Sequence, residues 1–126
     1  MKFIFKYPDK KKFLIFDGAG SEVFKGYLNP KEYSILHRRN ESINIPILLK
    51  SLFRFDLDCK LSEKYFLTYL EHVKPKLLLT LIENNPIFYS LKSKYFKFKK
   101  AFVQNGNGFI ETIKNYNLNK NKNMVD

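Results

Sequence analysis

Continuous apolar runs alternate along the chain with runs of helical period. The segment "KFLIFDGAGS" at 12–21 has four consecutive apolar residues and then an acidic residue and glycines. A short apolar run that ends in a tight loop is typical of a strand buried on both faces. The segments "EYSILHRR" at 32–39, "KLLLTLI" at 76–82 and "KKAFVQNG" at 99–106 have a similar form. We therefore predict a strand in each of the four.

Three segments between these runs have the pattern of helices. "ILLKSLFRF" at 47–55 follows Pro46, and proline suits the first turn of a helix. In "LSEKYFLTYLEHV" at 61–73 the apolar residues line one face, and Pro75 follows directly. Asn85 is a good N-cap for "PIFYSLKSKYF" at 86–96. Upstream, "KFIFKY" at 2–7 is a candidate partner of 12–16 in a hairpin through "PDKK".

The alternation of strands and helices predicts the fold class. Strands made of continuous apolar runs indicate a mostly parallel sheet that is covered on both faces. We predict a Rossmann-like three-layer α/β domain with about four to five strands over residues 1–112. A polar tail rich in lysine and asparagine follows at 113–126.

Polar residues follow each predicted strand. In open α/β sheets, ligands bind in the crevice beyond the carboxyl ends of the strands. We expect these residues to lie on one edge and to form a substrate site, in which Asp17 is the candidate catalytic carboxylate. The candidates are Asp17, Gly18, Gly20, Ser21, Arg38, Arg39, Glu83, Asn84, Gln104, Asn105 and Gly106.

Composition and charge narrow the class of protein. The hydrophobic fraction of 44% suits a folded domain, and the single cysteine, Cys59, allows no disulfide within the chain. The longest apolar stretch, at 77–82, is far shorter than the roughly 20 residues that span a bilayer. We expect a cytoplasmic protein. The net charge of +11 admits nucleic acid, an anionic membrane surface or a phosphorylated substrate as a partner.

No cofactor or metal is expected from the motifs. "GAGSEV" at 18–23 lacks the third glycine of a dinucleotide fingerprint, since Val23 stands there, and Asp17 brings a negative charge to the phosphate position. "DLD" at 56–58 resembles a metal-binding acidic pair, but it lies between two predicted helices, where a solvated loop is the better interpretation. His37, His72 and Cys59 have no metal-ligand spacing, although His37 lies beside the predicted ligand edge.

Nucleic acid is not the favoured partner. "LKSKYFKFKK" at 91–100 interleaves basic and aromatic residues, as single-strand binders do. The same pattern is expected at the end of a helix and the start of a strand that bury their aromatic side chains. We prefer this second interpretation and keep a basic nucleic-acid-binding protein as an alternative.

The segments "FDGAGSE", "ILHRRNESINIPILLKSLF" and "YLEHVKPKLLLTLIENNPIFYSLKSKYFKFKKAFVQNG" carry a resemblance to a known family. Over residues 12–108 the chain resembles the N-terminal part of bacterial surface-carbohydrate biosynthesis proteins, which are similar to glycosyltransferases of the GT-B type. The resemblance implies a role in making lipopolysaccharide or capsule. It places the protein in the cytoplasm, with the inner face of the membrane as a further location.

The resemblance also implies a division of labour. In GT-B enzymes the N-terminal domain mainly receives the acceptor, here a glycan or a lipid-linked sugar, and a second domain binds the nucleotide sugar. The 126 residues hold no second Rossmann pattern. The expectation is therefore a truncated or split enzyme, or one completed by a partner, with catalysis by this chain alone in doubt. A non-catalytic module that binds a glycan, a nucleotide or a protein is the alternative.

Overall fold

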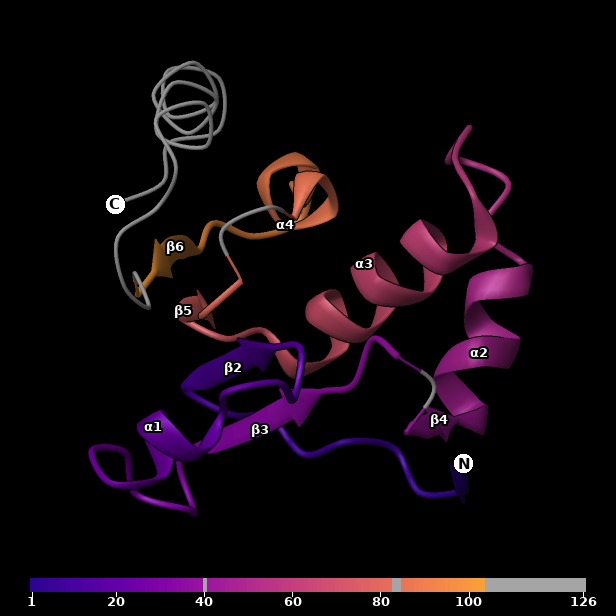
Figure 1. Ribbon diagram of the computed structural model, residues 1–126. Coiled ribbons are helices and arrows are strands. Elements are labelled where there is room, and N and C mark those ends of the chain that lie inside the picture. The colour runs from indigo at the N-terminus through magenta and orange to yellow at the C-terminus, as the bar shows by residue number, and fades with distance from the viewer. Residues whose placement is uncertain (40, 83–84, 104–126) are drawn as a thin grey trace.

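The computed structural model describes residues 1–39, 41–82 and 85–103. It confirms an α/β fold of the Rossmann-like kind (Figure 1). A four-stranded sheet has the order β3-β2-β5-β6, and all of its pairs are parallel. Its strands are β2 (Phe13–Phe16), β3 (Tyr33–Leu36), β5 (Leu77–Thr80) and β6 (Lys99–Phe102). Each lies within a segment that the apolar pattern predicts.

Helices cover both faces of this sheet. On one face lies the short α1 (Glu22–Lys25), which the sequence pattern does not predict. On the other face lie α3 (Leu61–Val73) and α4 (Pro86–Ser90), with α2 (Ile45–Leu52) packed against α3. The helix predicted at 61–73 has the same bounds in the structure, whereas the one predicted at 86–96 ends at Ser90.

Strand register explains how the side chains divide between the two faces. Alternate residues of a strand point to opposite faces, and paired residues of neighbouring strands share a face. Ile15 pairs with Ile35 and Leu79 on the α1 face, where Phe24 packs against them. Leu14 and Leu78 point to the opposite face, toward α3 and α4.

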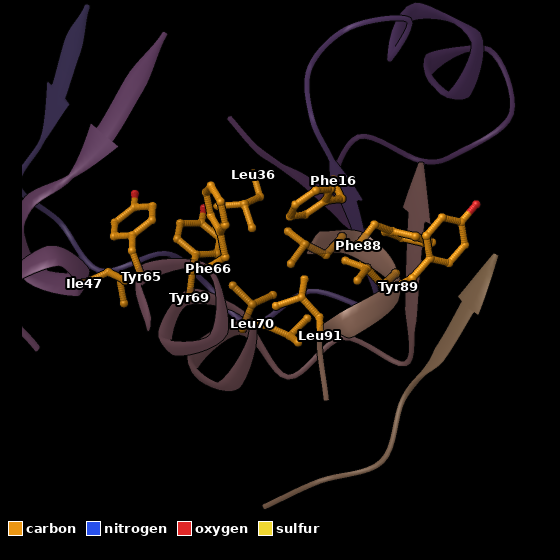
Figure 2. Packing of buried hydrophobic residues seen from close by; sticks show 13 residues of the cluster. Phe16, Leu36, Ile47, Tyr65, Phe66, Tyr69, Leu70, Phe88, Tyr89 and Leu91 are labelled. Atoms are coloured by element: carbon orange, nitrogen blue, oxygen red, sulfur yellow. The ribbon is translucent and has the colours of Figure 1, made fainter. Parts of the chain in front are cut away.

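The larger core lies on the α3/α4 face (Figure 2). Phe16 packs edge-on against Phe66 of α3, with ring centroids 5.5 Å apart, and at a tilt against Phe88 of α4. Such aromatic pairs add to the stability that area burial provides. Phe96 and Phe98 are half-buried against this core, as the core interpretation of the segment 91–100 expects, whereas Tyr95 of the same segment is 66% exposed.

Asparagine caps set the starts of two helices. Asn44 accepts a hydrogen bond from the backbone N–H of Ile47 at the start of α2. Asn85 does the same for Phe88 at the start of α4, where Pro86 suits the first turn. The cap predicted at Asn85 is therefore confirmed.

The predicted hairpin between residues 2–7 and 12–16 is wrong. Strand β1 (Lys2–Ile4) pairs in parallel with β4 (Ser42–Asn44), and the two form a separate ribbon. The side chain of Asn44 holds this ribbon to the following loop by donating to the carbonyl oxygen of Lys6 at 2.8 Å. A parallel partner far along the chain therefore replaces the antiparallel neighbour that the local turn signal predicts.

Within the described ranges, no helix is both long and apolar enough to cross a membrane. The tail predicted at 113–126 and the end of the predicted domain at 104–112 lie outside these ranges.

Candidate functional site

The strand order places a topological switch point at the carboxyl ends of β2 and β5. The chain goes from β2 to β3 on one side, and then returns past β2 to β5 and β6 on the other. Between β2 and β5 the direction of winding reverses, and ligands of open α/β sheets bind at such a point. The loop after β2, residues 17–21 and here called the β2 loop, forms one wall of this region.

Asp17 shapes the β2 loop. Its backbone has a left-handed conformation, with φ of 76°, and its side chain is fully buried. Oδ1 accepts a hydrogen bond from the N–H of Ala19 at 3.1 Å, and Oδ2 accepts one from Nε of Arg39 at 3.3 Å. Both oxygens of this carboxylate are thus engaged. Asp17 is placed to hold the loop and orient Arg39 rather than to meet a substrate directly.

Gly20 is required by the shape of the loop. Its φ is +75°, and a Cβ built there would lie 2.8 Å from Cδ1 of Leu81. Glycine adopts this conformation without the steric cost that other residues bear. The β2 loop therefore packs closely against the end of β5.

Gly18 lies beneath the imidazole of His37. A Cβ at Gly18 would lie 3.0 Å from Nδ1 and 3.2 Å from Cε1 of His37. On the other side, Nδ1 lies 3.7 Å from Oε2 of Glu41. This nitrogen is buried and has no hydrogen-bond partner. The same Oε2 accepts a hydrogen bond from the backbone N–H of Arg39 at 3.2 Å, so Glu41 holds the segment after β3 as well.

Two pockets meet at His37. The larger has a volume of about 340 Å³, and its walls come from β3, the β1/β4 ribbon and α3. The smaller, of about 240 Å³, is bounded by Arg38 and by residues of α2 and α3. His37, Ser42 and Tyr65 line both pockets. Such volumes approach or reach the lower end of the range for small-molecule sites.

Tyrosines give the larger pocket an amphipathic wall. The hydroxyl of Tyr65 accepts a hydrogen bond from the backbone N–H of Asn44 at 2.9 Å, which ties α3 to the ribbon. Burial raises the pKa of Tyr69 to about 12 and also raises the pKa of Tyr65. Both phenols therefore stay neutral and can exchange hydrogen bonds with a polar ligand at neutral pH.

The end of β5 contributes buried polar groups. Thr80 donates from its hydroxyl to the carbonyl oxygen of Phe16 at 3.1 Å and accepts from the N–H of Ile82. These bonds tie the ends of β2 and β5 together. Asn85 is fully buried, and its Nδ2 has no hydrogen-bond partner.

The structure brings together the first six of the predicted site residues. Asp17, Gly18, Gly20 and Ser21 lie in the β2 loop, and Arg38 and Arg39 follow β3 at the same edge of the sheet. Ser21 is buried and donates its backbone N–H to the carbonyl oxygen of Gly18. The remaining five predicted residues, Glu83, Asn84, Gln104, Asn105 and Gly106, lie outside the described residues.

Glu41 is the group that the sequence pattern does not single out. Its spacing of four residues from His37 is a usable signal on a helix, but His37 ends a strand and the segment between is a loop. The other candidate motif has a structural role: Asp56 of "DLD" pairs with Arg54, and this hydrogen bond lowers the pKa of Asp56. Among the residues that the structure describes, no group of three or more His, Cys, Asp or Glu could hold a metal ion.

Comparison of the chain with protein-family models, curated proteins and solved structures returned no match.

Proposed function

We propose that this chain is the acceptor-binding half of a glycosyltransferase-like cleft in the synthesis of a bacterial surface polysaccharide or lipopolysaccharide. The nucleotide sugar is bound by a second domain or a partner protein. The observation that carries the proposal is the cluster of Gly18, His37, Arg39 and Glu41 after β2 and β3. Its member His37 also lines two pockets between β3, the β1/β4 ribbon, α2 and α3. The sequence resemblance supplies the class of reaction.

His37 takes the central role in this proposal. Its imidazole lines both pockets, so a sugar hydroxyl bound in either can approach the ring. A general base must accept the proton that the acceptor hydroxyl loses as it attacks the donor sugar. Glu41, at 3.7 Å from Nδ1, stabilises the imidazolium that forms. Asp17, expected from the sequence to be the catalytic carboxylate, is assigned here to orienting Arg39.

Arg38 and Arg39 give the site a preference for anionic acceptors. Arg39 is 60% exposed although its Nε bonds to Asp17, so its guanidinium also faces solvent. Arg38 lines the smaller pocket. A planar guanidinium recognises carboxylate and phosphate groups through two parallel hydrogen bonds. Acidic sugars and sugar phosphates are therefore the acceptor class that we propose.

NMR titration of the isotope-labelled chain tests this function. Glucuronic acid and glucose 1-phosphate are the anionic probes, and methyl glucoside is the neutral one. We expect the amide signals of Gly18, Gly20 and His37 to move with the anionic probes, and about tenfold weaker binding in Gly18→Ala, whose new methyl group displaces His37.

Gly26→Ala is the matched control, because a Cβ at Gly26 meets only a backbone oxygen at 3.8 Å. This variant should bind the probes as the original chain does. If no sugar moves the signals of the β2 loop while a co-purified protein does, a protein-binding module replaces the acceptor site.

A further inference from the structure

A surface next to the two pockets combines exposed apolar side chains with lysines, and Lys2, Ile4 and Leu48 line the pockets from this side. On α2, Leu49, Leu52 and Phe53 follow one another at spacings of three and one and are 52%, 48% and 74% exposed. Phe55, just after the helix, is 85% exposed. α2 packs on α3 and lies at the side of α3 that is away from the four-stranded sheet (Figure 1). Apolar groups gathered in this way on a folded protein mark an interaction site.

The N-terminal segment extends this surface. Phe3 and Phe5 are 50% and 76% exposed, and the carbonyl oxygen of Lys6 is bonded to the side chain of Asn44, the cap of α2. The ring of Tyr7 stacks on His72 of α3, with ring centroids 4.8 Å apart. These contacts hold residues 3–7 beside the start of α2. We call residues 1–12 together with α2, its C-cap residue Phe53, and Phe55 the α2 surface.

Lysines occur in both parts of the α2 surface, of which Lys12 pairs with Glu32 at 3.6 Å and Lys11 donates to the carbonyl oxygen of Lys31. Residues 1–12 carry Lys2, Lys6, Lys10, Lys11 and Lys12. The acidic residue among them is Asp9, whose carboxylate lies 3.7 Å from Nζ of Lys6. Lys50 projects from α2 and is exposed.

Two of these lysines, Lys50 and Lys10, lie close enough to His72 of α3 to affect its charge. Burial lowers the pKa of His72, and the positive charges of Lys50 and Lys10 lower it further. The two lysines come from different segments of the α2 surface and act on the same imidazole. The surface is therefore positively charged where residues 1–12 meet α2.

We propose that the α2 surface docks on an anionic phospholipid membrane. Exposed aromatic and leucine side chains enter the interface between headgroups and acyl chains, while the lysines meet the lipid phosphates. Each lysine near an anionic membrane surface contributes roughly 1 kcal/mol of attraction. This inference goes beyond the proposed function, because it depends on no residue of the β2 loop and holds whatever reaction the site performs.

Co-sedimentation with lipid vesicles tests the docking. The full-length protein should bind vesicles of phosphatidylcholine with about one-third phosphatidylglycerol at least tenfold more tightly than vesicles of phosphatidylcholine alone. The binding should weaken strongly at high salt, where surface charges are screened. Equal binding to both vesicle types, or none to either, overturns the proposal.

Two variants separate the apolar and the basic contributions. Phe53→Ser with Phe55→Ser should weaken binding to the anionic vesicles about tenfold or more. Lys6→Gln with Lys50→Gln should weaken it by a similar factor and reduce its dependence on salt. All four residues are exposed, so both variants should keep the circular dichroism spectrum and urea midpoint of the original chain.

Tyr27→Ser is the matched control, because Tyr27 is 87% exposed and follows α1 on the other face of the sheet. It should bind the vesicles as the original chain does, and a loss as large as that of the Phe53 and Phe55 variant contradicts the proposal. Dimers in light scattering that are abolished by the Phe53 and Phe55 changes, without vesicle binding, would assign the surface to a second copy of the chain.

Discussion

The two faces of the four-stranded sheet differ in how many apolar residues are buried against them, and we call them the deep face (α3/α4) and the shallow face (α1). Among the described residues, the α3/α4 face has a cluster of 13 buried residues that includes Phe16 and Phe88, and two helices cover it. The buried cluster of the α1 face has Ile15, Phe24, Leu79 and Leu81, and a helix of four residues covers it. The deep face supplies most of the apolar burial, and the shallow face lies beneath the β2 loop. The deep face also contributes Tyr65 and Tyr69 of α3 to the wall of the larger pocket, so the candidate site draws on both faces.

Matched deletions of one phenylalanine from each face test this comparison. Phe16→Ala should lower the free energy of unfolding by about 3–5 kcal/mol, because a fully buried ring leaves a cavity in a well-packed cluster. Phe24→Ala should cost less than about 3 kcal/mol, since the thin α1 cover can collapse into the space. Urea denaturation followed by circular dichroism measures both. Equal losses in the free energy of unfolding would mean that the two faces contribute equally to stability.

A methyl group in the β2 loop gives a smaller effect on the shallow face. Gly20→Ala should cost about 1–2 kcal/mol, because its left-handed backbone disfavours a side chain. Gly26→Ala, at φ of −75°, should be neutral or stabilise by up to about 1 kcal/mol. The same denaturation experiment compares the two. A Gly20→Ala variant as stable as Gly26→Ala would argue against a strained, tightly packed loop.

Lys100 is a buried charged side chain on the deep face, where it pairs in register with Leu78. Its side chain is buried, Nζ donates to the carbonyl oxygen of Tyr89 at 2.7 Å, and burial lowers its pKa from 10.5 to about 8. The charged form is disfavoured in the fold, so stability should rise with pH between about 8 and 10.5, where the folded chain has released the proton and the unfolded chain retains it.

Lys100→Met should flatten this rise. At pH 7 it should also stabilise the protein, because the variant avoids the burial of a charge. The gain should be about 1 kcal/mol or less, because the hydrogen bond to Tyr89 is lost. Urea midpoints between pH 7 and pH 11 measure the effect. A variant that keeps the full pH dependence would assign that dependence to another group.

The sequence predicts the parts of the fold that depend on local pattern. The apolar runs at 13–16 and 77–80 identify the central strands, and Asn85 identifies the start of α4. It places a strand in the segment of β1 but gives it the wrong partner, because β1 pairs with a segment that has no strand signal of its own. Such a pairing is decided by tertiary packing, which overrides short-range preferences.

The candidate site is likewise predicted only in part by the sequence. The β2 loop and Arg39 follow from the rule that the ends of parallel strands meet at one edge. The position of His37 against Gly18 and Glu41 does not follow from it, because that position depends on how the segment after β3 folds back over the β2 loop. Placing a side chain within a few ångströms of another requires the three-dimensional arrangement.

The parallel sheet also determines the order in which the protein can fold during synthesis. Thr80 of β5, which bonds to the carbonyl oxygen of Phe16 in β2, lies 64 residues later in the chain. On the ribosome, β2 therefore emerges long before its second neighbour, and Leu14 and Phe16 stay exposed in the interval. Long-range pairings of this kind fold slowly and leave apolar segments open to aggregation. We expect the nascent chain to depend on chaperones until β5 and α4 have been made.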